Sequence, residues 1–120
     1  MIEAIVDTQS LKFVYTLGDE KVTLQEAAML YYMSEREREL DCELVFSIED
    51  FVEHFANSSS RSSWLLSADM MILSAIVKKS CDGSLTLTDH GESWIHDNFS
   101  SLYALSVIYT GDHAFTLGEC

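Results

Sequence analysis

The sequence predicts a single α+β domain, and three observations support this prediction. The chain has 120 residues, the usual size of one domain, and 48% of them are apolar, which is enough to fill a core. Alternating apolar residues near the N-terminus favour short strands. Further along, helix-capping patterns and an Asp-Gly pair between β-prone runs indicate helices followed by a hairpin.

The first elements are predicted to be two short strands or a hairpin, followed by a helix. Residues 2–17 alternate in polarity, and Gly18-Asp19-Glu20 ends the second run. Thr23 and Glu26 form a Thr-x-x-Glu capping box, which marks the start of a helix. This helix has a wide apolar face, and alternating charges over residues 34–40 are typical of a solvated helix end.

Two further helices are predicted after an extended connection over residues 43–46. Ser47 caps a helix of about ten residues that stops at Ala56-Asn57. A serine-rich turn over residues 57–63 leads into the next helix, which carries a second apolar stripe. Because each lies on the apolar stripe of its helix, five large residues are predicted to share one core: Phe51, Phe55, Trp64, Ile72 and Trp94.

A hairpin is the most specific local pattern in the chain. Asp82-Gly83 lies between two β-prone runs and predicts a two-residue turn, with Ile76-Val77 pairing antiparallel to residues 85–87. Thr88 or Asp89 then caps a fourth helix. Beyond it, residues 102–109 are apolar, and Gly111-Asp112 is expected to turn the chain into a last short run over residues 114–117.

The order helix, short helix, turn, helix and hairpin is that of a winged helix-turn-helix. Residues 47–55 resemble the first helix of that motif, and residues 59–73 occupy the place of its recognition helix. Residues 76–91 resemble the wing of MarR-type regulators, which ends in a similar Leu-Thr-x-x-Gly. The resemblance covers about residues 23–99. It implies a winged-helix core over these residues. The strands predicted within residues 1–22 precede this core, and an apolar C-terminal extension over residues 100–120 follows it.

The sequence departs from the pattern of the winged-helix family at two places. Ser74-Ala75 stand where the family usually has a glycine between the recognition helix and the wing. The expected recognition helix offers Arg61 and several serines in place of the usual set of Arg, Lys, Gln and Asn side chains.

The resemblance implies a transcription regulator that binds DNA. The DNA-facing groups would be at the start of the recognition helix and at the wing: Ser59, Ser60, Arg61, Ser62, Ser63, Lys78 and Lys79. Arg61 could bind a guanine bidentately, the serines could bind phosphates, and the lysines could contact the backbone. The alternative interpretation of the same residues is a serine-rich helix cap with two solvated lysines.

The charge balance favours a second hypothesis. Twenty acidic residues against seven basic ones give a net charge of −13, whereas a DNA-binding domain usually has a basic face. An acidic winged-helix module that binds protein, as an adaptor or as an inhibitor mimicking nucleic-acid charge, therefore stays open. The position of the acidic residues relative to Arg61 and Lys78 distinguishes the two hypotheses.

The sequence gives no sign of an enzyme, a cofactor or a metal site. It has no Gly-rich phosphate loop or Gly-x-Ser-x-Gly motif. Its histidines lack zinc-ligand spacing; they are His54, His90, His96 and His113. Binding of DNA or a protein partner, without catalysis, is therefore expected.

Cellular location and oligomeric state can also be predicted. Three widely spaced cysteines (Cys42, Cys81 and Cys120) favour reduced thiols, and no apolar run approaches the ~20 residues that cross a bilayer. A cytoplasmic protein without membrane contact is expected. The apolar residues of the C-terminal extension predict a homodimer contact.

Overall fold

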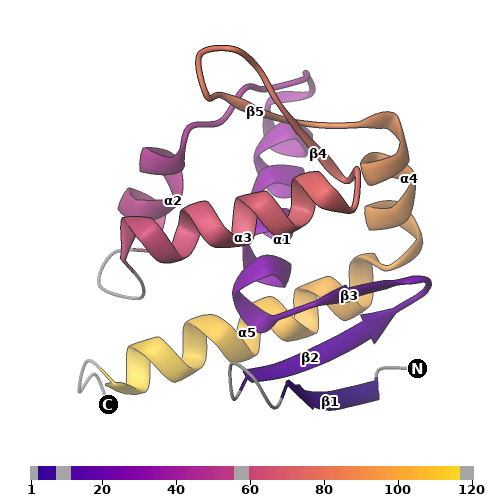
Figure 1. The fold of residues 1–120 in the computed structure, drawn as a ribbon, viewed down its shortest axis with the longest axis vertical. Coiled ribbons are helices and arrows are strands. Elements are labelled where there is room, and N and C mark those ends of the chain that lie inside the picture. Colours follow the sequence, from indigo (N-terminus) through magenta and orange to yellow (C-terminus); the bar gives the residue numbers. More distant parts are fainter. Residues whose placement is uncertain (1–2, 8–11, 56–59, 117–120) are drawn as a thin grey trace.

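The computed structural model describes residues 3–7, 12–55 and 60–116. These residues form an α+β fold of five helices and two small antiparallel sheets. Figure 1 shows the N-terminal sheet and the hairpin over residues 77–87 at opposite ends of the molecule. The α+β prediction is therefore confirmed at this level.

The N-terminal sheet has three strands rather than the two predicted. β1 (Glu3–Asp7) pairs with β2 (Lys12–Leu17), and β2 pairs with β3 (Glu20–Val22). Gly18 adopts a φ of 62° in the turn between β2 and β3, which glycine accepts without strain. The predicted break at this point is thus a tight turn into a third strand. The Trp94 indole Nε1 donates to the Leu17 carbonyl oxygen at 3.0 Å and ties this sheet to the helices.

The capping box predicted at Thr23 begins α1 (Leu24–Leu40). The Glu26 amide donates to Thr23 Oγ1 at 3.2 Å, and the Thr23 amide donates to Glu26 Oε1 at 3.1 Å. The helix ends at Asp41, which has a left-handed φ of 53°. α1 lies along α5, and residues 27–30 in its N-terminal half are fully buried. α1 therefore lies in the interior of the fold.

α2 (Ile48–His54) and α3 (Arg61–Leu73) follow as predicted, although α2 is shorter than the expected ten residues. Ring stacking joins them, because Trp64 lies 5.7 Å from Phe51 and 5.1 Å from Phe55 between ring centroids. The predicted core is confirmed: Phe51, Phe55, Trp64 and Trp94 are buried together, and Ile72 packs against them half-buried.

The predicted hairpin is present as β4 (Val77–Lys79) and β5 (Leu85–Leu87). Its loop differs from the predicted two-residue turn. The Ser80 amide donates to the Ser84 carbonyl oxygen at 2.9 Å, so the loop consists of residues 81–83. Gly83 alone of the Asp-Gly pair takes a positive φ, of 88°, as in three-residue loops. Phe46 bonds the other edge of β5 through paired amide and carbonyl groups.

The junction between α3, the hairpin and α4 (Asp89–Asp97) explains the Leu-Thr-x-x-Gly pattern. The Thr88 hydroxyl lies 2.5 Å from the Ala75 carbonyl oxygen and accepts the Gly91 amide at 2.8 Å. A Cβ on Gly91 would lie 2.1 Å from the Ile76 carbonyl oxygen, so only glycine allows this approach. Ala75, at the place where the family usually has a glycine, has a left-handed φ of 62°, which a Cβ disfavours.

The C-terminal prediction of a turn at Gly111-Asp112 is wrong. α5 runs without interruption from Phe99 to Thr116. Leu102, Leu105 and Tyr109 recur at helical spacing and are buried. This packing outweighs the cost of one glycine in a helix, about 1 kcal/mol relative to alanine.

Candidate functional site

The serines predicted to face DNA have different surroundings. Ser59 lies outside the described residues. Ser60 caps α3 by accepting the Ser63 amide at 3.2 Å, and Ser62 is exposed. The Ser63 hydroxyl is half-buried and lies 3.1 Å from Gln25 Nε2, so it holds α3 against α1. Of these serines, Ser62 faces outward from the helix, while Ser63 has a structural role.

Arg61 already has a carboxylate partner. Its Nε lies 3.1 Å from Glu49 Oε2 and its Nη2 lies 3.4 Å from Glu49 Oε1. Both side chains are exposed, so solvent weakens the pair, and it is worth at most about 1 kcal/mol. A guanine would nevertheless have to displace a fork-shaped contact of the same geometry.

The two lysines of β4 lie in different hollows. Lys79 shares a hollow of about 300 Å³ with Arg61, and three carboxylates also line it: Glu49, Asp69 and Asp82. Hydrogen bonds from Ser84 hold the pKa of Asp82 below its ordinary value, so this carboxylate is ionised. Lys78 lines a separate hollow of about 250 Å³ with Glu37 and Glu43. The structure thus brings Arg61 and Lys79 together, separates Lys78 from them, and places acidic groups beside all three.

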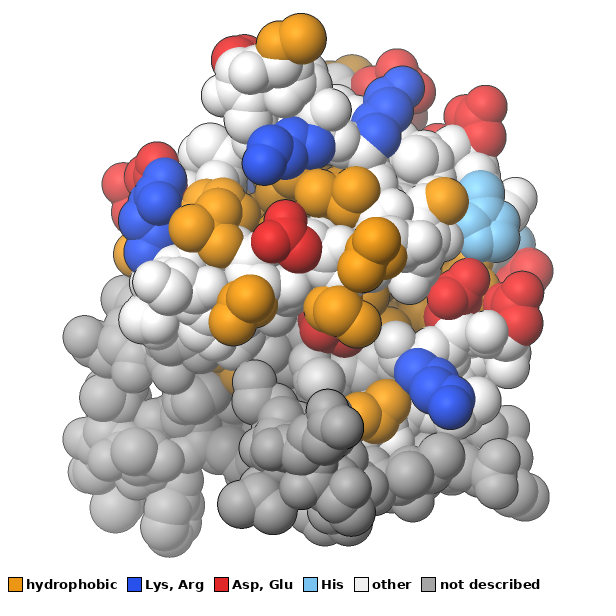
Figure 2. All heavy atoms as spheres, viewed as in Figure 1, with side chains coloured by type: hydrophobic (Ala, Val, Ile, Leu, Met, Phe, Trp, Pro, Cys, Tyr) orange, Lys and Arg blue, Asp and Glu red, His pale blue; other side chains and the backbone are white. Residues whose placement is uncertain are grey.

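The outward side of α3 carries an apolar stripe that the sequence analysis did not identify. Leu66, Met70 and Leu73 are 66%, 52% and 80% exposed, and Asp69 lies among them. We call these four residues the outer face of α3. Figure 2 shows hydrophobic side chains spread over this side of the molecule, with acidic and basic groups among and around them. The i, i+4, i+7 spacing of the three apolar residues was the signal that could have identified the stripe.

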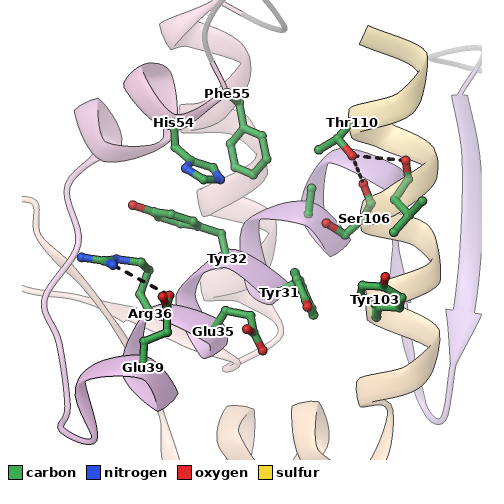
Figure 3. A pocket seen from close by; sticks show the side chains of 12 residues that line it. Tyr31, Tyr32, Glu35, Arg36, Glu39, His54, Phe55, Tyr103, Ser106 and Thr110 are labelled. Atoms are coloured by element: carbon green, nitrogen blue, oxygen red, sulfur yellow. Dashed lines mark hydrogen bonds and ion pairs between the residues drawn. The ribbon is translucent and has the colours of Figure 1, made fainter. Parts of the chain in front are cut away.

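A second candidate region is a groove of about 540 Å³ between α1, the end of α2 and α5. We call it the α1–α5 groove. Figure 3 shows its aromatic lining, in which the rings of Tyr32 and His54 lie tilted against each other with centroids 4.1 Å apart. The ring centroids of Tyr31 and of Tyr103 in α5 lie 5.5 Å apart. The helical spacing of Tyr31 and Tyr32 is that of core residues, but both side chains are half-buried and line this groove.

Three rings of the α1–α5 groove, those of His54, Tyr31 and Tyr32, have pKa values shifted towards the neutral form. Burial, and then the charge of Arg36, lowers the pKa of His54, so its imidazole is neutral at neutral pH. Burial raises the pKa of Tyr31, with a further contribution from the Glu35 carboxylate. The pKa of Tyr32 is raised by burial and then by Asp50. The rings therefore present uncharged aromatic surfaces.

The C-terminal extension folds back on its own chain. Leu102, Leu105 and Tyr109 of α5 are buried, whereas Tyr103, Val107 and Ile108 are exposed. The homodimer contact remains a prediction. No group of three or more His, Cys, Asp and Glu side chains suited to a metal ion occurs within residues 3–7, 12–55 and 60–116.

Comparison with known proteins gives no relative. No protein-family model matches the chain, and no curated protein or solved structure shows significant similarity to it. Within the part of the chain that the structure describes, no helix is both long and apolar enough to span a bilayer.

Proposed function

We propose that this chain is a winged-helix module that binds a partner protein through the outer face of α3. The winged-helix assignment rests on the order α1, α2, α3, β4, β5 and on the junction at Thr88 and Gly91. In a helix-turn-helix protein, the helix at the position of α3 enters the major groove of DNA. The chemistry of its outward side therefore decides between DNA and protein as the partner.

The exposed stripe of Leu66, Met70 and Leu73 is the observation that carries the proposal. Base edges are recognised mainly by Arg, Lys, Asn and Gln side chains, and aliphatic groups contact little besides the thymine methyl. Asp69 in the middle of the stripe would be repelled by phosphates. Covering these side chains with a partner removes apolar area from water, which is favourable by roughly 25 cal/mol per Å², so an apolar partner surface gains most from this face.

The charges around the outer face of α3 also suit a protein partner. The neighbouring hollow holds Arg61 and Lys79 together with Glu49, Asp69 and Asp82. A rim that carries positive and negative charges suits a protein interface, in which polar groups surround an apolar centre. A DNA-binding surface, by contrast, needs an excess of cations to release counterions from the phosphates.

A pull-down with matched variants tests the proposal. The full chain is used as bait in an extract of the source cell, and Leu66→Glu is compared with Val45→Glu. The two residues are matched in exposure, at 66% and 64%, but Val45 lies outside α3. We expect a partner that binds the wild type and Val45→Glu and that loses most of its binding to Leu66→Glu. Equal binding to all three baits would contradict the proposal.

DNA binding is a second candidate, favoured by the shared hollow of Arg61 and Lys79 beside the start of α3. Fluorescence anisotropy with labelled duplexes at low salt tests it. If DNA is the partner, Arg61→Ala should weaken binding to a specific site more than binding to random DNA. Lys78→Ala should weaken both about equally and lower the salt slope by roughly one unit. No binding of folded protein to a broad set of sequences would exclude this candidate.

A further inference from the structure

α5 exposes a face that carries no charged side chain. Leu102, Leu105 and Tyr109 point inward from this helix and are buried. On the opposite side, exposed residues recur at helical spacing: Ser100, Tyr103, Ala104, Val107, Ile108 and Gly111. We call these residues the outer face of α5. Charged residues make up 22% of the chain, yet residues 98–111 contain none, so this face is neutral along its whole length.

The charged groups next to this face cancel in pairs. Tyr103 also lines the α1–α5 groove (Figure 3), and each carboxylate that lines the groove has a cationic partner. A carboxylate oxygen of Glu39 lies 3.8 Å from Arg36 Nη1. Glu35 accepts a hydrogen bond from Arg38. The side of the face that adjoins the groove is therefore close to neutral as well.

A net charge of −13 restricts where this protein can meet a copy of itself. Two copies repel each other over any surface on which carboxylates face carboxylates. The outer face of α5 avoids this repulsion, because neither copy places a charge there. A basic partner, by contrast, would find no carboxylate to bind on this face. The absence of charge over residues 98–111 thus favours a second copy of the chain as the occupant.

We propose that the outer face of α5 binds the same face of a second copy, helix against helix, about a two-fold axis. In such a contact each copy contributes the same surface, which must therefore fit itself. The face contains large and small residues, and the small ones are Ser100, Ala104 and Gly111. The large side chains of one copy pack over the small residues of the other. The contact shares no residue with the outer face of α3 and does not depend on the protein contact proposed above.

Sedimentation equilibrium of the full chain, at rising protein and salt concentrations, tests the dimer. We expect a monomer–dimer equilibrium with a dissociation constant below about 1 mM, the weak end of specific association. Salt should strengthen this association, because it screens the repulsion between two acidic copies and the contact contains no ion pair. A chain that stays monomeric up to about 1 mM, or a dimer that salt weakens, would overturn the proposal.

Opposite charges at Val107 test which face forms the contact. Val107 lies in the middle of the outer face of α5, so position 107 of one copy lies near position 107 of the other, whichever way the second helix runs. Val107→Glu alone and Val107→Lys alone should each weaken the dimer roughly tenfold, because like charges then meet. An equimolar mixture of the two variants should form a heterodimer. Both new residues favour a helix more than valine does, so neither change endangers α5.

Leu40 provides the matched control. It is 52% exposed against 49% for Val107, and it ends α1, away from both outer faces. Leu40→Glu and Leu40→Lys change the net charge by the same amounts, and we expect both to dimerise like the wild type, alone or mixed. The proposal is overturned if Leu40→Glu weakens the dimer as much as Val107→Glu does. It is also overturned if the mixed Val107 variants associate no better than each variant alone.

Discussion

The two sides of α3 carry similar apolar residues in opposite surroundings. Its inner side places Trp64, Ala68 and Met71 in the core, while its outer side exposes Leu66, Met70 and Leu73. A helix that is apolar on both sides is expected to be buried on both, yet only one side of α3 is covered by the rest of the described chain. The apolar pattern of this helix therefore forms two surfaces, one packed in the core and one exposed, and the exposed one is the surface that we propose for partner binding.

The largest expected effect separates these two surfaces by stability. Phe51→Ala removes a ring that stacks on Trp64 at the inner side of α3, and it should lower the free energy of unfolding by about 3–5 kcal/mol. Leu73→Ala, on the outer side, should change it by less than about 0.5 kcal/mol. Urea denaturation measures both. A similar loss for the two variants would show that the outer face also supports the fold.

The start of α4 should not tolerate added volume where it packs against the residue before β4. Gly91→Ala places a Cβ against the Ile76 carbonyl oxygen at 2.1 Å and should destabilise the fold by about 3 kcal/mol. Gly111→Ala is the matched control, because no atom lies within 4 Å of its added Cβ. That change should stabilise α5 by about 0.5–1 kcal/mol. If thermal unfolding shows equal midpoints for the two variants, the close packing at Gly91 is refuted.

Most elements in the first two-thirds of the fold could be predicted because their signals are local. The capping box at Thr23, the serine-rich turn before a helix and the Asp-Gly hairpin each depend on a few neighbouring residues. The capping box, the helix that follows the serines and the hairpin are present. The continuity of α5 could not be predicted in this way. It depends on packing against α1, whose stabilisation outweighs the cost of placing Gly111 within a helix. β3 was missed because it has three residues and follows a tight turn.

The candidate sites were harder to predict because they depend on which residues meet in space. Arg61 and Lys79 share a hollow as expected of a common surface, but Lys78 lies elsewhere, since successive strand residues point to opposite sides. The ion pair of Arg61 with Glu49 joins α3 to α2, and no short-range sequence pattern indicates it. The groove aromatics have the spacing of core residues, but Tyr31 meets rings of α5 while Tyr32 meets His54 of α2, and both stay half-buried.

A smaller effect should distinguish the two tryptophans of the interior. Trp94 donates to Leu17, whereas the buried Trp64 Nε1 has no acceptor among the described residues. Trp94→Phe should therefore cost about 1 kcal/mol more than Trp64→Phe, because both lose similar ring volume but only the former loses a hydrogen bond. Calorimetric unfolding of the two variants gives this difference. A greater loss with Trp64→Phe would indicate that its indole N–H does have a partner.

The smallest expected effect concerns charge at the surface. Burial, then a hydrogen bond to and repulsion by Glu37, raise the pKa of Glu92. The folded state therefore holds this proton more tightly, and the resulting stability is present at low pH and lost as pH rises through the raised pKa. Glu92→Gln should raise the unfolding midpoint at pH 7 and leave it unchanged at about pH 4. An unchanged midpoint at pH 7 would be evidence against the Glu37–Glu92 repulsion.

Site-specific photocrosslinking tests the central claim most directly, because it reports what touches the outer face of α3 in the cell. A photoreactive amino acid is placed at Leu73, which is 80% exposed, and separately at Val45 as the control. We expect a discrete crosslinked protein from position 73 that is absent from position 45. Crosslinking of position 73 to DNA, or the same products from both positions, would contradict it.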